Sequence, residues 1–180
     1  MKILNFLILF LFALFANNVL SADFAGPLTY TSDLQPGGPV VVQQRNVPSD
    51  PSPYSTGYYP ESKTCFLLVN TAVPASVGIE KEVAIMHEAG HCHELRLGLQ
   101  DINGGATRYG EGFADVFALA WISKNDPDKF QEASFWLLQK RNLDRQANPA
   151  YNTLLIIRRA MISLPSGELP EEFTRKLLGE

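Results

Sequence analysis

The sequence has no excess of positive charge, no internal repeat and only two cysteines. Its 15 Lys and Arg residues are outnumbered by 19 Asp and Glu residues, which gives a formal net charge of -4. Chains that bind nucleic acid usually carry a basic patch, so nucleic acid is not expected as a partner. The lack of a repeat excludes solenoid and propeller architectures. The remaining composition is typical of a globular protein, and 180 residues predict one domain with one core.

Residues 1–22 have the layout of a secretory signal peptide. Lys2 precedes an almost purely apolar run over residues 3–16, and two asparagines then interrupt it. Cleavage after Ser21 and cleavage after Ala22 both fit this pattern, and the exact bond stays open. An uncleaved membrane anchor is the alternative, because the run approaches the roughly 20 residues that span a bilayer. In either case the rest of the chain is expected outside the cytoplasm, either periplasmic or secreted.

The two cysteines, Cys65 and Cys92, both follow this leader. An even pair in an oxidising compartment can form a disulfide. A small buried thiol on the back of a helix is an equally good interpretation of Cys92. The sequence does not show whether the two Cα atoms approach within bonding range, so the disulfide stays open.

Proline and glycine are frequent in residues 23–62, and little regular structure is expected between residues 35 and 60. Short apolar runs at Val40–Val42 and Cys65–Val69 predict strands of a small sheet, the second of them buried. Residues 63–180 are expected to form the domain that carries the chemistry.

Helical patterns follow the second apolar run. One helix is expected from Ile79 to a stop at Gly98, with Ser76 as its N-cap. A second is expected over Tyr109–Lys124, where apolar residues recur at three- and four-residue steps. Further helices are expected to open at three prolines, in Asp126-Pro127, Asn148-Pro149 and Leu169-Pro170-Glu171. The expected fold class is α+β, with a small N-terminal sheet over the first helix and a helical C-terminal half.

The most informative segment reads His87-Glu88-Ala89-Gly90-His91. Two histidines four residues apart on an α-helix stack one turn above the other and can direct both imidazoles at one ion. Zinc fits this pair best, because it accepts neutral imidazole and keeps a tetrahedral site. Two histidines leave the ion short of one protein ligand, with the last position available to water.

Glu111 is the third ligand in this interpretation. The chain between His91 and Glu111 is long enough for the first helix to end, a loop to turn back, and the second helix to present its first turn. Asp115 lies one turn deeper on the same face of that helix. It can accept the ring N–H of a liganding histidine, which fixes the tautomer of the imidazole and raises its basicity.

Together, His87-Glu88-x-x-His91 and Glu111-x-x-x-Asp115 resemble the motifs of the gluzincins, the zinc peptidase superfamily that includes thermolysin. The resemblance covers the segment between these motifs and leaves the rest of the chain unmatched. It implies one zinc ion per chain held by His87, His91 and Glu111. It further implies a general base at Glu88, Asp115 as the partner of His87, and a minimal zincin-like fold.

Two other zinc families do not fit these residues. A metzincin needs a glycine and a third histidine after the helix motif, where Glu94 and Leu97 stand in this sequence. A peptide deformylase takes its third ligand from a cysteine in a Glu-Gly-Cys setting, whereas Cys65 follows Lys63-Thr64.

The other polar residues near the motif have plainer interpretations. His93 lies about 120° from the ligand face of the helix, which predicts a rim or solvent position. Gly90 predicts a close approach of neighbouring backbone. A solvated helix face is expected for four charged residues, Glu80, Lys81, Glu94 and Arg96. Three tyrosines are expected to cover a small core more than to line a cleft, Tyr54, Tyr58 and Tyr59.

These observations predict a secreted or periplasmic zinc-dependent metallopeptidase whose substrate is a peptide or protein, and which meets a membrane only through an uncleaved leader. Zinc would activate a water whose proton Glu88 takes, and an edge strand would hold the substrate extended. The donor that stabilises the oxyanion is left open among five residues, Tyr109, His93, Tyr151, Arg158 and Arg159. Two alternative functions also remain: a non-catalytic zinc-bearing binding module, and an amidase acting on peptidoglycan cross-links.

Overall fold

The computed structural model describes residues 40–62, 64–99 and 105–163. The signal peptide expected at residues 1–22 and the last helix expected near Leu169 lie outside these ranges. Within them, no helix combines the length and the apolar character that crossing a membrane requires. The fold class is α+β, as the sequence predicts: the described ranges contain a three-stranded sheet and four α-helices.

The sheet contains β1 (Val40–Arg45), β2 (Tyr54–Tyr59) and β3 (Thr64–Asn70), in the order β1-β3-β2. β1 is parallel to β3, and β2 is antiparallel to it. Strands at β1 and β3 are confirmed, but the expectation of little regular structure before residue 60 misses β2. The prolines flank β2 and do not interrupt it, so its ladder with β3 is complete. The sheet thus joins chain from both sides of the boundary expected at residue 62.

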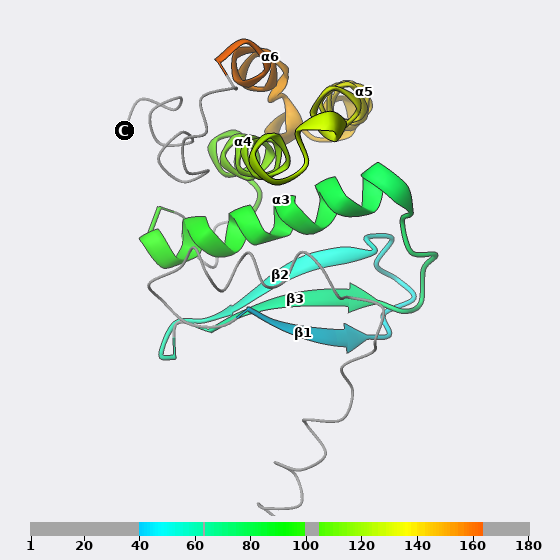
Figure 1. Cartoon of the computed structure of the whole chain (residues 1–180). Helices are drawn as coiled ribbons and strands as arrows, with labels where there is room; N and C mark the ends of the chain where they lie inside the picture. The colour runs from blue at the N-terminus through cyan, green and yellow to red at the C-terminus, as the bar shows by residue number, and fades with distance from the viewer. Residues whose placement is uncertain (1–39, 63, 100–104, 164–180) are drawn as a thin grey trace, which may run out of the picture.

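Four helices follow the sheet, separated by two short 3-10 turns. They are α3 (Gly78–Leu97), α4 (Arg108–Asn125), α5 (Phe130–Ala147) and α6 (Leu154–Ser163), with η2 (Pro127–Lys129) and η3 (Pro149–Tyr151) before α5 and α6. Figure 1 shows α3 lying across the sheet, with α4, α5 and α6 on its other side. α3 is therefore the middle layer, covered by strands on one side and by helices on the other.

The ends of the first two helices follow local chemistry. α3 stops at Gly98, as expected, in the left-handed conformation with φ 70°. The expected N-cap, Ser76, is wrong: Val77 occupies the position, and its aliphatic side chain has no acceptor with which to cap the helix. Gly78 follows as the first residue of the helix, with φ 58°. At the start of α4, the Thr107 side chain accepts a hydrogen bond of 3.0 Å from the Gly110 N–H.

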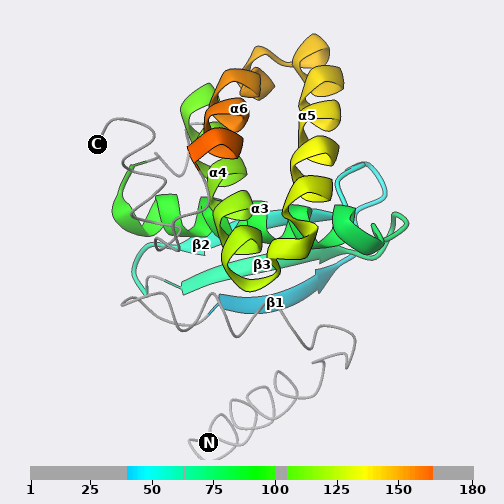
Figure 2. The ribbon, with the colours of Figure 1, turned by 45° about the horizontal axis from the view of Figure 1, so that its top comes forward.

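The core is centred on α4, which contacts each of the other three helices (Figure 2). Every residue from Gly110 to Ile122 is buried. The apolar face that the sequence predicts, around Phe113 and Phe117, packs there with side chains of α3, α5 and α6. Burial on all sides explains why α4 is apolar almost all round.

Gly90 sets the distance between α3 and α4. A Cβ atom at this position would lie 2.7 Å from the Cα atom of Ala114 and 3.1 Å from the Cβ atom of Phe117. Real Cβ atoms do not approach backbone so closely, so only glycine permits this packing. The close backbone approach expected at Gly90 is confirmed.

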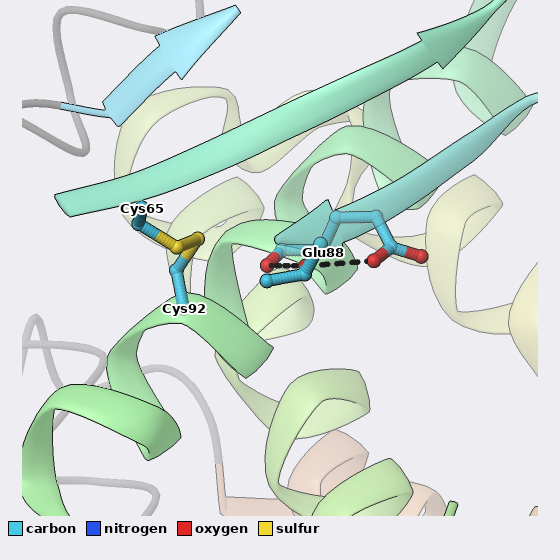
Figure 3. The surroundings of a disulfide bond; sticks show 4 residues. Cys65, Glu88 and Cys92 are labelled. Carbon is cyan, nitrogen blue, oxygen red and sulfur yellow. Dashed lines mark hydrogen bonds between the residues drawn. A yellow bond between two sulfur atoms is a disulfide. The ribbon is translucent and has the colours of Figure 1, made fainter. Parts of the chain in front are cut away.

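A disulfide between Cys65 and Cys92 joins β3 to α3, with a Cα–Cα distance of 5.8 Å. Of the two interpretations that the sequence leaves open, the structure adopts the bridge. Figure 3 shows the bridge between strand and helix, and Glu88, which precedes Cys92 by four residues on α3. A bridge that closes a loop of this length contributes on the order of 3 kcal/mol to stability in the chain-entropy model. It fastens the sheet to the helix that carries the His-Glu-x-x-His motif.

We expect Gly90→Ala to destabilise the protein. Helix propensity alone would favour alanine by about 1 kcal/mol. The contact with Ala114 outweighs this, since overpacking costs about 1–3 kcal/mol and backbone yields less than a side chain. Denaturant unfolding should show a lower free energy of unfolding, with the exposed Glu132→Ala as a control that changes it by less than about 0.5 kcal/mol. A more stable Gly90→Ala protein would contradict the close helix packing.

Candidate metal centre

Three side chains from two helices converge as the sequence predicts. His87 and His91 project from α3, one turn apart, and Glu111 projects from the first turn of α4. The two Nε2 atoms are 3.1 Å apart. Glu111 Oε2 lies 3.3 Å from His87 Nε2, and Glu111 Oε1 lies 3.6 Å from His91 Nε2. This group can hold a metal ion, with one donor atom from each residue.

Asp115 lies behind His87, in the position that the sequence predicts. Its Oδ1 atom is 2.9 Å from His87 Nδ1, on the ring edge opposite the converging Nε2 atoms. Thr153, just before α6, donates a hydrogen bond of 2.6 Å to Asp115 Oδ2. Asp115 and Thr153 are both fully buried, so the orientation of the His87 ring is fixed from the protein interior.

Arg141 is a member of the centre that the sequence analysis does not identify. It projects from α5 and is 6% exposed. Its Nη2 donates to Glu111 Oε2 at 2.9 Å and to Asp115 Oδ1 at 2.7 Å, and its Nε donates to Asp115 Oδ2 at 2.9 Å. The Tyr151 ring lies 4.8 Å from its guanidinium carbon. Arg141 therefore ties two carboxylates of α4 to α5.

Glu94 and His93 are corrections to the sequence analysis. Glu94 was expected on a solvated helix face, but its side chain is fully buried and its Oε2 lies 3.3 Å from His91 Nδ1. His93 was expected at the rim, but it is buried against Phe113 and Phe117, with ring centroids 6.2 Å and 5.5 Å away. Both expectations treated α3 as a surface helix, whereas layers on two sides cover most of its circumference.

Buried charge in the centre is strongly unbalanced. Three buried carboxylates, those of Glu94, Glu111 and Asp115, face one buried guanidinium, that of Arg141. Two negative charges therefore need a counter-charge inside the protein, because an uncompensated buried charge is very costly. A divalent cation between the three donor atoms would supply it.

Without a cation, protons bound to the histidines supply positive charge beside the buried carboxylates. Burial lowers the pKa of His91, but hydrogen bonds to Glu111 and Glu94 outweigh it and raise this pKa from 6.5 to about 10. Burial also lowers the pKa of His87, and hydrogen bonds to Asp115 and Glu111 raise it above its ordinary value. Burial raises the pKa of Glu111, yet its hydrogen bonds to both histidines hold it well below the usual range.

Glu88 contacts the edge strand of the sheet and does not belong to the group of three donor residues. The hydroxyl of Thr56, on the edge strand β2, lies 2.8 Å from Glu88 Oε2 and 2.7 Å from the Glu88 carbonyl oxygen. A hydroxyl has one hydrogen to donate, so it bonds one of these oxygens at a time. Glu88 is thereby held between α3 and the edge of the sheet (Figure 3).

A cleft with a volume of about 690 Å³ opens above the three converging side chains. β2 forms one wall, and α5 with η3 forms the other. Glu88, both histidines and Glu111 lie along its floor. Tyr54 is buried in the core, as the sequence favoured, and it also lines the cleft. Tyr58 lines the cleft as well, while Tyr59 is 59% exposed. The size is typical of sites that bind ligands.

The cleft narrows the choice among the five residues that the sequence left open as the hydrogen-bond donor to the oxyanion. Tyr151 lines it. Burial and the nearby charge of Glu111 raise the pKa of the Tyr151 hydroxyl, so it stays protonated and able to donate at neutral pH. His93 is buried away from the cleft, and Arg158 and Arg159 lie exposed on α6. Tyr109 is not among the residues that line the cleft.

Some of the residues that the sequence analysis missed have a recognisable signal in the sequence, and others have none. Glu94 stands three residues after His91, and residues three apart on a helix are neighbours, so its contact with this ring was readable. Arg141, Thr153 and Thr56 carry no comparable mark. They reach the centre from α5, from the turn before α6 and from β2, through long-range packing.

We expect the purified protein to hold about one divalent metal ion per chain, measured by elemental analysis. His87→Ala, His91→Ala and Glu111→Ala should each lose the ion, because each removes a donor atom. Asp115→Asn should bind about 10–100-fold more weakly, as expected when a group behind a ligand is changed. Full metal occupancy in the two histidine variants, or loss of the ion in Asp115→Asn but not in Glu111→Ala, would contradict these assignments.

We also expect metal binding to release protons. In the metal-free protein the pKa of His87 is raised above its ordinary value and that of His91 lies near 10, so at pH 7 the His91 imidazole holds a proton that a cation must displace. Apparent affinity should therefore rise with pH from about 6.5 toward about 10. Calorimetric titration with Zn²⁺ as the probe ion, in buffers of different ionisation enthalpy, measures the number of protons released. Binding without any proton release would contradict the ion-paired metal-free state.

Comparison with known proteins adds no family to this geometry. Neither family models, curated proteins nor solved structures match the chain. The donor set, the charge and the cleft are therefore the evidence on which a function can be proposed.

Proposed function

We propose that this protein is an extracytoplasmic zinc-dependent peptidase of the gluzincin type. The observation that carries the proposal is the spacing of the three donor atoms. Ligands 2.0–2.1 Å from a tetrahedral zinc ion stand about 3.3–3.4 Å apart. Here the two histidine Nε2 atoms are 3.1 Å apart, Glu111 Oε2 lies 3.3 Å from His87, and Glu111 Oε1 lies 3.6 Å from His91. With one donor atom taken from each residue, all three atoms lie within 4.8 Å of one another. Two imidazoles and one carboxylate are also a donor set of catalytic zinc sites.

The cleft supports an open site rather than a structural one. A structural zinc ion is normally enclosed by four protein ligands. Among the described residues, the group that can hold a metal has three members, and all three line the cleft. The three residues that would hold a zinc ion therefore border the space where a substrate would lie. This favours the peptidase over the non-catalytic zinc-bearing module.

Glu88 is the general base in this proposal. When bound, zinc supplies Lewis-acid activation of water and of a substrate carbonyl. Glu88 lines the cleft but is outside the donor group, so its carboxylate is free to take the proton of the attacking water and to pass it to the leaving amine. The hydrogen bond from Thr56 orients this carboxylate toward the cleft from the side of β2.

Tyr151 is the donor we assign to the carbonyl oxygen on which negative charge develops. It lines the wall opposite β2, and its hydroxyl keeps its proton at neutral pH. A donor that is fixed before the reaction stabilises this charge better than water does. Packing of its ring on the Arg141 guanidinium, at 4.8 Å, fixes the tyrosine in place.

The substrate class follows from the edge strand. β2 pairs with β3 on one side, and its other side faces the cleft, with residues 52–58 along the wall. An extended peptide can pair with such an edge through backbone hydrogen bonds. The substrate we propose is therefore a peptide or an extended protein segment. The Cys65–Cys92 disulfide supports a location outside the cytoplasm, where such bonds persist.

Glu88→Gln separates a peptidase from a zinc scaffold. In the peptidase, the amide cannot accept the proton, so hydrolysis of a cleaved peptide should fall about 10²–10⁴-fold. Zinc content and melting temperature should stay close to those of the parent, since Glu88 does not bind the ion. The measurement is turnover of a peptide library by both proteins at equal zinc occupancy, with a chelated sample as the blank. Equal rates of hydrolysis would remove this mechanism.

A further inference from the structure

Glu94 is a buried acid to which the proposed reaction gives no role. Its side chain is fully buried, it is outside the donor group, and it is not among the residues that line the cleft. Its Oε2 lies 3.3 Å from His91 Nδ1, and its Oε1 has no hydrogen-bond partner among the described residues. A carboxylate in such a place is costly unless a cation or a donor compensates it.

The orientation of His91 supplies that donor. When His91 binds an ion through Nε2, its Nδ1 must carry the ring proton. Glu94 Oε2 is placed to accept this proton in a hydrogen bond, just as Asp115 Oδ1 stands 2.9 Å from Nδ1 of His87. Each histidine thus has a carboxylate behind it. The carboxylate behind His87 comes from α4, whereas the one behind His91 comes from α3 itself.

Gly110 gives Glu94 the space it occupies. A Cβ atom at position 110 would lie 3.0 Å from both carboxylate oxygens of Glu94. A side chain there would press on this carboxylate and, at 3.2 Å, on the Thr107 hydroxyl. Gly110 also directly precedes the ligand Glu111, in the first turn of α4, where the helix dipole favours a negative charge. The absence of a side chain at this position is therefore linked to the metal centre.

We propose that Glu94 is a positioning residue for the metal ligand His91, and that Gly110 is a glycine because it admits the Glu94 carboxylate. The proposal rests on the metal-binding role proposed above and extends it to two further residues. Glu94 fixes the ring of His91 with its Nε2 lone pair directed at the ion. Its negative charge also makes this imidazole a stronger donor.

Two substitutions of Glu94 test the first part. Glu94→Ala leaves the His91 ring proton without an acceptor and should weaken Zn²⁺ binding about 10–100-fold, measured by competition with a chelator. Glu94→Gln keeps the shape and an accepting oxygen but loses the charge, so it should weaken Zn²⁺ binding less than Glu94→Ala does. Asp115→Asn is the matched variant at the other histidine, and the exposed Glu132→Gln is the control for loss of a charge, with unchanged affinity.

Spectroscopy separates positioning from packing. With Co²⁺ as a probe ion in place of zinc, the ligand-field bands report the geometry around the metal. They should shift in Glu94→Ala and stay unchanged in Glu132→Gln. In the zinc-bound parent, nitrogen-15 NMR should show the His91 Nδ1–H proton protected from exchange and shifted downfield by its carboxylate acceptor. Glu94→Ala should lose both features. A residue with a packing role alone would change the melting temperature without moving either spectrum.

Gly110→Ala tests the second part with Glu94 still present. The new methyl group should displace the carboxylate, weaken Zn²⁺ binding about 10-fold or more, and remove the protected His91 proton. When Gly110→Ala is combined with Glu94→Ala, it should weaken Zn²⁺ binding by less than about 2-fold further, because the carboxylate that it would displace is already absent. Additive losses in this cycle would show that Gly110 does not act through Glu94.

The possible failures are distinguishable. If the parent protein binds no Zn²⁺, the proposed function and this inference both fail. If the parent binds Zn²⁺ while Glu94→Ala and Gly110→Ala bind it equally well with unchanged Co²⁺ spectra, the inference fails alone. Weaker binding with altered spectra in both variants supports it, even if Glu88→Gln shows that the protein is not a peptidase.

Discussion

The close packing of α3 against α4 is the constraint on which the metal centre depends. The two histidines belong to α3, while Glu111 and Asp115 belong to α4, so the donor geometry is fixed by the distance between these helices. Gly90 sets that distance, one residue before His91, because no side chain separates its backbone from Ala114. A contact in the core thus controls how far apart the ligands stand, with no polar group involved.

Charge compensation is the second constraint, and it draws on groups from more than one helix. Arg141 brings a guanidinium from α5 to the carboxylates of α4, and Thr153 adds a donor from the turn before α6. These groups leave the buried site with an excess of negative charge, which protons on the histidines or a divalent cation can balance. The fold therefore does not merely tolerate a cation between α3 and α4. It concentrates the charge that attracts one, at a cost that the packing of four helices has to offset.

The sequence reveals those parts of this design that are local or follow a fixed period. The spacing of His87 and His91, the one-turn offset from Glu111 to Asp115 and the stop at Gly98 all follow from helical geometry, and all are confirmed in the structure. The features that the sequence analysis missed depend on which other elements pack against a helix. Glu94 was assigned to solvent because its helix was taken as one-sided, and Arg141 has no motif at all. Both errors come from tertiary burial, which a repeat of 3.6 residues does not encode.

The two faces of the centre have different physical tasks, and this explains why its polar groups are distributed so unevenly. On the buried face, Asp115, Glu94 and Arg141 hold the imidazoles and the ligand carboxylate in one arrangement, with almost no contact with water. On the open face, the cleft leaves room beside Glu88 and Tyr151 for the proposed peptide substrate. In the proposed peptidase, a rigid set of donors would lower the cost of reorganisation when charge develops, and an open face would be needed for turnover. The Cys65–Cys92 bridge serves both requirements, because it fixes the sheet, with its free edge at β2, to the same helix that carries the ligands.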